Sequence, residues 1–490
     1  MSKLLAAASA AALFAGPAAA LTAPELWEDW QAVLTNLGLS VEAETEDYAD
    51  GTLTLDGLSM TSEQAIFGEE ITTETRIDGA HRLVEEDDGS VRIELPAESV
   101  ITSTTEGSDG PIETVYTQAV QDAAIVARDA QDGARLYDVA MGSTTLSVDD
   151  VSAGEAETPV PMTIAMTGIG GTHRTEPDGT TYAQDYTIEA IAVDVDASAN
   201  PEPGSVALAY ENVATSVTGA LPDDQGDAAA NNPFTMGMTY DGTLSHGGGT
   251  LRVAGENPQG SFQVESRSGS GQLDIAADEA GLGYDIESRD VAMTFDVPSF
   301  PLPVSAGLAS SRTALTVPIA PNPAAPWAME VALRDLTVDD ALWSLVDPTG
   351  QLPRDPATLS LSLDGEAEVT ADLFADPDAA AEDFPIRPLT ANVTELLLTA
   401  AGVRLAGTGA LRFPEDTPVP DPVGTIDLVL DGGLALADRL VALGLIPQQQ
   451  AMFARAMIGG FATQTGEDTY ESTIEFTPGG GITANGTPIR

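Results

Sequence analysis

The stretch GTLRVAGENPQGSFQVESRSGSGQLDI, residues 249–275, shows how the chain is expected to fold. It holds three segments of the form Gly-x-Φ-x-Φ, where Φ is apolar, and these are spaced eleven residues apart. Alternation of apolar and polar residues is typical of a β-strand with one buried face. Eleven residues are enough for one strand and one turn, so the spacing predicts an antiparallel meander. A β-solenoid would keep this period along most of the chain, whereas here it lasts for three units.

The same alternation continues through most of the sequence. Examples are TLTLDGLSMT (52–61), SVALAYENVATSV (205–217) and TLSLSLDGEAEV (358–369). Asp-Gly steps favour the positive φ angles of tight hairpin turns, and they separate many of these segments. We therefore predict a mainly β protein built on a large, curved antiparallel sheet, with one N-terminal helix and a few short C-terminal helices. The Asp-Gly steps are Asp56-Gly57, Asp78-Gly79, Asp88-Gly89, Asp109-Gly110, Asp178-Gly179, Asp241-Gly242, Asp364-Gly365 and Asp431-Gly432.

Helical periodicity is confined to short segments. Thr22 and Glu25 form a capping box and Gly38 is a stop signal, so a helix is predicted between them. Its face holds Trp27 and Trp30, which we expect to pack on the sheet, with ligand binding as the alternative. Further helices are predicted over 338–346, 434–445 and 448–460. The last two form a hairpin that lies on the sheet or closes one end of it, with apolar residues Leu440, Val441, Leu445, Met452, Phe453, Ala456 and Met457.

The first twenty residues, MSKLLAAASAAALFAGPAAA, have the pattern of a secretory signal peptide. Lys3 precedes an apolar run that is too short to span a bilayer, and a small-residue cleavage site follows it. The mature chain is therefore expected to begin at Leu21. Lipid attachment would need a cysteine, which the chain lacks. We predict an exported, periplasmic protein without a transmembrane segment in its mature chain.

The chain is strongly acidic, with 77 Asp and Glu against 19 Lys and Arg and a formal net charge of −58. Such a surface repels phosphate backbones and anionic lipid headgroups, so a nucleic acid is not expected as a partner. A salt-adapted surface is the favoured interpretation. Pro-rich and small-residue stretches predict joints, the main one near residue 225. The predicted parts are a signal peptide (1–20), an N-terminal helix with an antiparallel β region (21–225), and a second antiparallel β region with the helical hairpin (226–490).

Few residues have the chemistry or spacing of a catalytic or metal site. Lys3 is the single lysine and there is no cysteine, which excludes a P-loop, a Schiff base and a thiolate site. The three histidines, His81, His173 and His246, do not have zinc-site spacing. The acidic stretch 222–232 lacks the spacing of a calcium loop and is interpreted as solvated. We therefore predict no catalytic, cofactor-binding or metal residues and no cofactor.

The segment LWSLVDPTGQLPRDPATL, residues 342–359, concentrates unusual residues and is interpreted as a structural corner. A short helix containing Trp343 precedes a turn at Asp347, and Pro353 stiffens the path into the next strand. Arg354 lies between Asp347 and Asp355 in sequence, so an ion pair with one of them is expected. The side chain of Trp343 is expected to be buried. An electrophilic Arg354 in a catalytic site is the alternative.

The same segment, continued to LWSLVDPTGQLPRDPATLSLSLDG, resembles a family of uncharacterised exported alphaproteobacterial proteins. The N-terminal LWEDWQAVLTNLG and the ending GGGITANGTPIR are similar to that family as well. The final Gly-rich strand also resembles the C-terminal strands of AsmA-like envelope proteins. These resemblances imply an exported, mostly β protein of the cell envelope, and they carry over no catalytic residue.

These expectations together favour a non-enzymatic periplasmic protein that binds or shields lipid or other apolar envelope material. The alternative is a structural or protein-interaction module of the envelope, with an envelope protein as partner. A hydrolase with a triad assembled from distant segments is third.

Overall fold

The computed structural model describes residues 20–36, 38–66, 69–106, 110–153, 156–157, 161–177, 179–198, 203–222, 232–372, 385–414 and 421–489. The predicted signal peptide and the acidic stretch 222–232 lie almost wholly outside these residues. The protein is mainly β, with a large antiparallel sheet, an N-terminal helix and short C-terminal helices, so the predicted fold class is confirmed. No helix in the described part of the chain is long and apolar enough to cross a membrane.

The chain divides into two compact units. Unit 1 comprises 1–193 with 214–226, and unit 2 comprises 194–213 with 227–490. The points of division fall inside β11 (Thr181–Asp196) and β12 (Gly204–Ala220). The predicted boundary near residue 225 stays a prediction.

Unit 1 is a ladder of antiparallel strands. Pairing runs from β1 through β2, β3, β5, β6 and β8 to β10. The short strands β4 and β7 pair with each other. β4 pairs with β3, which also pairs with β5, and β7 pairs with β8, which also pairs with β6. The elements are α1 (Ala23–Asn36), β1 (Leu39–Ala49), β2 (Thr52–Ile66), β3 (Glu69–Glu85), β4 (Val91–Glu94), β5 (Glu98–Glu106), β6 (Ile112–Gln121), β7 (Ala124–Asp129), β8 (Arg135–Ala153), β9 (Ala156–Glu157) and β10 (Met162–Thr175).

Helix α1 covers the apolar side of the first strands. The predicted capping box is present, because the Thr22 amide donates to Glu25 Oε2 at 3.0 Å and the Glu25 amide donates to Thr22 Oγ1 at 3.4 Å. Gly38, with a φ of +74°, follows the helix as predicted. The Trp27 side chain is buried and its Nε1 donates to Glu46 Oε1 at 3.0 Å. The core below the helix consists of Leu21, Ala23, Leu26, Trp27, Val41, Leu53, Leu55, Leu83, Val91, Ile93 and Ala127.

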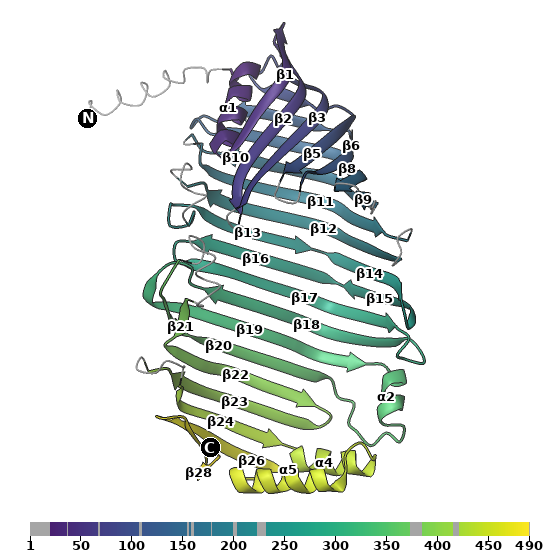
Figure 1. Cartoon of the computed structure of the whole chain (residues 1–490), viewed down its shortest axis with the longest axis vertical. Coiled ribbons are helices and arrows are strands. Elements are labelled where there is room, and N and C mark those ends of the chain that lie inside the picture. The colour runs from purple at the N-terminus through teal and green to yellow at the C-terminus, as the bar shows by residue number, and fades with distance from the viewer. Residues whose placement is uncertain are drawn as a thin grey trace, which may run out of the picture. The chain divides into compact units, whose positions relative to one another are not determined.

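Unit 2 is a longer ladder whose strands follow almost in chain order (Figure 1). β12 pairs with β14, β14 with β15 and β13 with β16, and both β15 and β16 pair with β17. The order then runs β18, β19, β20, β22, β23, β24, β26, β27 and β28, with β21 also on β20 and β25 on β26.

The bounds of the unit 2 strands and helices follow the predicted alternation and periodicity. The strands are β13 (Thr239–His246), β14 (Gly248–Asn257), β15 (Gly260–Ser268), β16 (Ser270–Asp278), β17 (Gly281–Asp296), β18 (Val304–Val317), β19 (Asn322–Val338), β20 (Ala357–Val369), β21 (Ile386–Pro388), β22 (Thr390–Ala400), β23 (Val403–Arg412), β24 (Val423–Asp431), β25 (Thr463–Gln464), β26 (Thr469–Thr477), β27 (Gly481–Ala484) and β28 (Thr487–Pro488). The helices are α2 (Asp340–Val346), α4 (Gly433–Ala442) and α5 (Gln448–Phe461).

The eleven-residue spacing does not correspond to one strand and one turn throughout. β14 and β15 form a hairpin, as predicted, but β16 continues β15 after the single residue Gly269. The pairing of Asn257 with Gly260 and of Tyr240 with Ala277 belongs to one long hairpin that a bend interrupts. The strands are therefore about twice as long as the spacing predicted, which widens each face of the sheet.

Several Asp-Gly steps lie inside strands instead of in hairpin turns. Asp56-Gly57 is a β-bulge in β2, where the register with β3 shifts, and Asp364-Gly365 lies within β20. Asp88-Gly89 does form a turn between β3 and β4. Two-residue turns with two positive φ angles occur at Asp50-Gly51, Ala401-Gly402 and Asn485-Gly486.

Candidate functional site

One face of the unit 2 sheet carries apolar side chains on strand after strand. Residues directly opposite each other in antiparallel strands lie on the same face, so the register gives the rows of that face. We call the following three rows the apolar face. The central row is Leu244, Leu273, Ile286, Thr313, Val331, Leu361, Leu396, Gly407, Leu428 and Ser472. One flanking row is Ile275, Tyr284, Leu315, Met329, Leu363, Val393, Gly409, Ile426 and Ile474, and the other is His246, Gly271, Ser288, Ser311, Leu333, Leu359, Leu398, Leu405, Leu430 and Tyr470.

A residue in a left-handed conformation keeps the apolar side chains of β17 on one face. Asp290 has a φ of +53°, which Asp tolerates better than most residues. Apolar side chains occupy even positions up to Ile286 and odd positions from Val291 to Phe295. Such a residue inside a strand interrupts the two-residue alternation and shifts it by one position. The apolar face therefore continues past the interruption.

The opposite face of β16 to β20 is polar and held by ion pairs. Arg312 donates to Asp285 at 2.6 Å and contacts Glu330 at 3.1 Å. The hydrogen bond from Arg312 holds the pKa of the Asp285 carboxyl below its usual value, although partial burial opposes this. Thr243 Oγ1 donates to Asp274 Oδ1 at 2.7 Å in the same layer. The two faces thus differ sharply in chemistry.

The apolar face is open over the middle of the ladder. Ile286 is 45% exposed, Leu398 is 40% exposed, and Leu359 and Leu244 are each 39% exposed. In a packed core, less than a tenth of the surface of a large apolar residue is exposed, as for Leu55 and Leu83 of unit 1. Helix α2 lies beside the ends of the strands, and α4 and α5 lie next to β24 and β26 (Figure 1). Among the described elements of unit 2, no helix covers β16 to β20 as α1 covers the first strands of unit 1.

A second, smaller apolar site lies in unit 1. A pocket of about 350 Å³ is lined by Trp30, Val33, Leu34, Tyr137, Val139, His173, Thr175 and Tyr186. Trp30 Nε1 donates to Tyr137 Oη at 3.1 Å, and the His173 and Tyr137 rings are 5.6 Å apart. Burial lowers the pKa of His173, against the effect of a hydrogen bond with Gln184. The two tryptophans of α1 therefore differ in their surroundings, since Trp27 packs in the core and Trp30 lines a pocket.

A third hollow, at the ends of β12, β14 and β15 in unit 2, has a mixed polar and apolar lining. Its volume is about 860 Å³, and Asp194, Asp196, Glu256 and Asp296 line it together with Arg252. Arg252 pairs with Glu265 at 3.3 Å. Within the described ranges no group of three or more His, Asp or Glu side chains is placed to hold a metal ion.

The predicted corner is a structural element whose contacts differ in part from those expected. Asp347 is fully buried and accepts from the Leu352 amide at 2.7 Å and from Thr349 Oγ1 at 3.2 Å. Burial alone would raise the pKa of Asp347, but these hydrogen bonds outweigh it and lower the pKa. Pro353 lies against the Ala401-Gly402 turn, since a Cβ at Gly402 would be 3.0 Å from Pro353 Cγ.

The prediction that Arg354 forms an ion pair with Asp347 or Asp355 is wrong. Arg354 donates to Asp340 of α2 at 2.6 Å, and its guanidinium lies 5.6 Å from the centre of the Trp343 ring. Asp355 is exposed, and Trp343 is half-buried where a buried side chain was expected. Arg354 pairs with Asp340 because helix α2 places Asp340 opposite Arg354 across the loop. Asp347 is turned inward, where it accepts a hydrogen bond from the backbone of that loop.

Of the histidines, which are of interest for a triad assembled from distant segments, His81 and His173 contact polar groups of their own strands, and His246 packs against neighbouring strands. His81 Nδ1 is 3.2 Å from the Gly79 carbonyl, and His173 Nε2 is 3.0 Å from Thr175 Oγ1. The His246 ring lies over Gly271 and is 4.6 Å from the Tyr210 ring. A Cβ at Gly271 would lie 2.2 Å from His246 Nε2, so the glycine makes room for the ring.

The sequence showed the strands of the apolar face but did not show that the face is open. Alternation reports that one side of a strand is apolar, and it is the same for a covered and an uncovered face. The aromatic pocket of unit 1 was missed, because its residues come from a helix and three strands far apart in sequence. Comparison of the chain with protein-family models, with curated proteins and with solved structures found no match.

Proposed function

We propose that this protein binds lipid or other apolar material on the apolar face of unit 2 and does not act as an enzyme. The supporting observation is the exposure of Ile286, Leu359 and Leu398 on a face whose rows are apolar on most strands. Contiguous exposed apolar surface larger than a few hundred Å² is typical of an interaction site in a water-soluble protein. A role in the cell envelope, after export to the periplasm, is part of this proposal and rests on the N-terminal pattern and the family resemblance.

The chemistry of the rows favours a hydrocarbon chain as the ligand. His246 is the only ionisable residue among them besides Tyr284 and Tyr470, so the face offers no anchor for a charged group. A hydrocarbon chain laid on such a face gains about 25 cal/mol for each Å² removed from water. The carboxylates of the opposite face and the net charge of −58 disfavour an anionic headgroup close to the protein. A neutral or zwitterionic lipid is therefore the favoured class.

The test is a binding measurement with paired charge insertions. Ile286→Asp with Leu359→Asp places two carboxylates on the apolar face, where both side chains are exposed enough for the fold to tolerate them. Ala276→Asp with Thr316→Asp places the same charges at exposed positions of the opposite face, in the same ladder. Binding of a fluorescent phosphatidylcholine and copurified lipid in native mass spectrometry are the readouts.

The first variant should lose at least tenfold in affinity, while the opposite-face variant should bind as the unchanged protein does. Equal binding by both variants, or purified protein free of lipid that also fails to take up the probe, would refute the proposal. Pull-downs that return a protein partner lost only in the first variant would favour the interaction module instead.

A further inference from the structure

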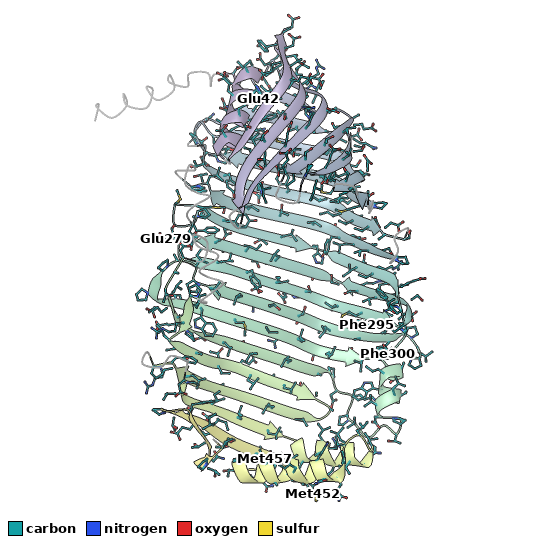
Figure 2. The ribbon with its side chains drawn as sticks, in the orientation of Figure 1. Glu42, Glu279, Phe295, Phe300, Met452 and Met457 are labelled. Atoms are coloured by element: carbon teal, nitrogen blue, oxygen red, sulfur yellow. The ribbon has the colours of Figure 1, made fainter. Side chains whose placement is uncertain are left out.

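The α4–α5 hairpin presents large apolar side chains to solvent. Phe453 is 67% exposed, Met452 56%, Leu445 45% and Met457 41%. Met452 and Met457 lie on α5 (Figure 2). Residues 452, 453, 456 and 457 are neighbours on a helix surface at 3.6 residues per turn, so they form one stripe, and Leu445 lies in the loop that leads into the helix. We call these four side chains, Leu445, Met452, Phe453 and Met457, the hairpin patch.

The inner side of α5 is built from smaller contacts. Ala451 is buried, and Ala454, Ile458 and Phe461 are half-buried. Ser472 of β26 donates to the Phe461 carbonyl at 2.8 Å, which ties the end of α5 to the sheet. The helix therefore packs against the protein through its other side, and the side chains of the hairpin patch are not needed for that packing. Of the apolar residues of the predicted hairpin, Met452, Phe453 and Met457 are therefore exposed.

The charge of the hairpin differs from that of the rest of the chain. Between Gly432 and Gly466 there is one acidic residue, Asp438, and there are two arginines, in a protein whose acids outnumber its bases by 77 to 19. Asp438 pairs with Arg455 of α5. The segment itself carries a formal charge of +1, so it does not add to the repulsion that the rest of the surface exerts on lipid headgroups.

We propose that the α4–α5 hairpin docks on the surface of a lipid bilayer, with the hairpin patch inserted among the headgroups and upper acyl chains. In an interfacial helix the large apolar side chains on one side insert into the bilayer, and Met452, Phe453 and Met457 are such side chains on α5. A second copy of the chain fits this patch less well, because it would bring a second net charge of −58 close to the first, whereas a zwitterionic bilayer carries no net charge. Docking does not require a lipid on the apolar face of unit 2, so it stands or falls separately from the proposed function.

The test is flotation of the full chain with phosphatidylcholine vesicles at about 0.15 M salt, where the Debye length is about 8 Å. Met452→Glu with Phe453→Glu should lower the bound fraction at least tenfold, and Phe453→Trp should keep binding and shift its fluorescence to the blue on vesicle addition. The matched control is Phe300→Glu with Leu302→Glu, which changes two side chains that are 38% and 64% exposed in the loop after β17. Phe300 is labelled in Figure 2. This control should bind as the unchanged protein does.

Three results would overturn the proposal. Vesicle binding that both double variants reduce equally would show that exposed apolar residues adhere without a specific site. Binding that neither variant changes would place the contact elsewhere. Light scattering that shows a dimer in the unchanged protein and a monomer after Met452→Glu with Phe453→Glu would make the patch a contact between copies. Circular dichroism of each variant checks that the fold is kept, which the exposure of all four positions leads us to expect.

Discussion

The openness of the apolar face predicts that equal truncations in unit 2 have unequal costs. Leu352 is 7% exposed and Leu359 is 39% exposed, and Leu→Ala removes the same three carbons at both positions. At about 0.8 kcal/mol for each carbon, complete burial of the three corresponds to about 2.4 kcal/mol. For Leu359 the buried share reduces this to roughly 1.5 kcal/mol, and a solvent-filled gap adds no cavity cost. For Leu352 the value stays near 2.2 kcal/mol and an enclosed cavity adds to it, for a total of about 2.5–4 kcal/mol.

Urea unfolding read by hydrogen-exchange mass spectrometry on peptides from β19 to β22 separates unit 2 from unit 1. Leu352→Ala should lower the free energy of unfolding by at least about 1 kcal/mol more than Leu359→Ala does. The Leu352 backbone amide still donates to Asp347 after the truncation, so the comparison isolates the side chains. If the two variants were equally destabilised, the apolar face would be covered and the reasoning behind the proposed function would fail.

Three further predictions concern charge and protonation. The melting temperature should rise with salt, because the Debye length falls from about 30 Å at 0.01 M to about 3 Å at 1 M and screens the net charge of −58; a salt-independent melting temperature would contradict this. The lowered pKa of Asp347 stabilises the folded state above about pH 3.9, and this contribution is lost as the pH falls through the folded-state pKa. Asp347→Asn should therefore be less stable than the unchanged protein at about pH 5, and the difference should shrink as the pH is lowered below about 3.9 in urea titrations. Because the pKa of His173 is lowered in the folded protein, the unfolded chain binds the proton more readily, and the stability of unit 1 should fall as the pH drops below about 6.5. His173→Gln should remove this part of the pH dependence. An unchanged dependence of stability on pH in this variant would show that His173 is not shielded from water.

The helices and strands follow from short-range patterns in the sequence. The capping box of Thr22 and Glu25, the stop at Gly38 and the strands over 205–217 and 358–369 are features of local periodicity, and each is present. Turn positions were less predictable. Asp-Gly permits a positive φ angle, which serves a bulge such as Asp56-Gly57 as well as a hairpin turn, and the choice depends on how far the partner strand extends.

The candidate sites depend on distances across the fold, which local patterns do not contain. Arg354 pairs with Asp340, fourteen positions away, instead of its sequence neighbours, because α2 turns Asp340 toward it. The stripe containing Phe453 has the periodicity of a packed face, yet the structure leaves that stripe outward and packs the helix through Ala451.

The sequence by itself determined that the chain is a mainly β, cysteine-free and strongly acidic protein whose strands are apolar on one side. Only the tertiary structure decided which apolar surfaces are covered. In unit 1 helix α1 buries Leu55 and Leu83, while in unit 2 Ile286 and Leu359 have the same alternation and stay exposed. The physical reason is that alternation sets the direction of a side chain, whereas burial requires a second element to lie over it.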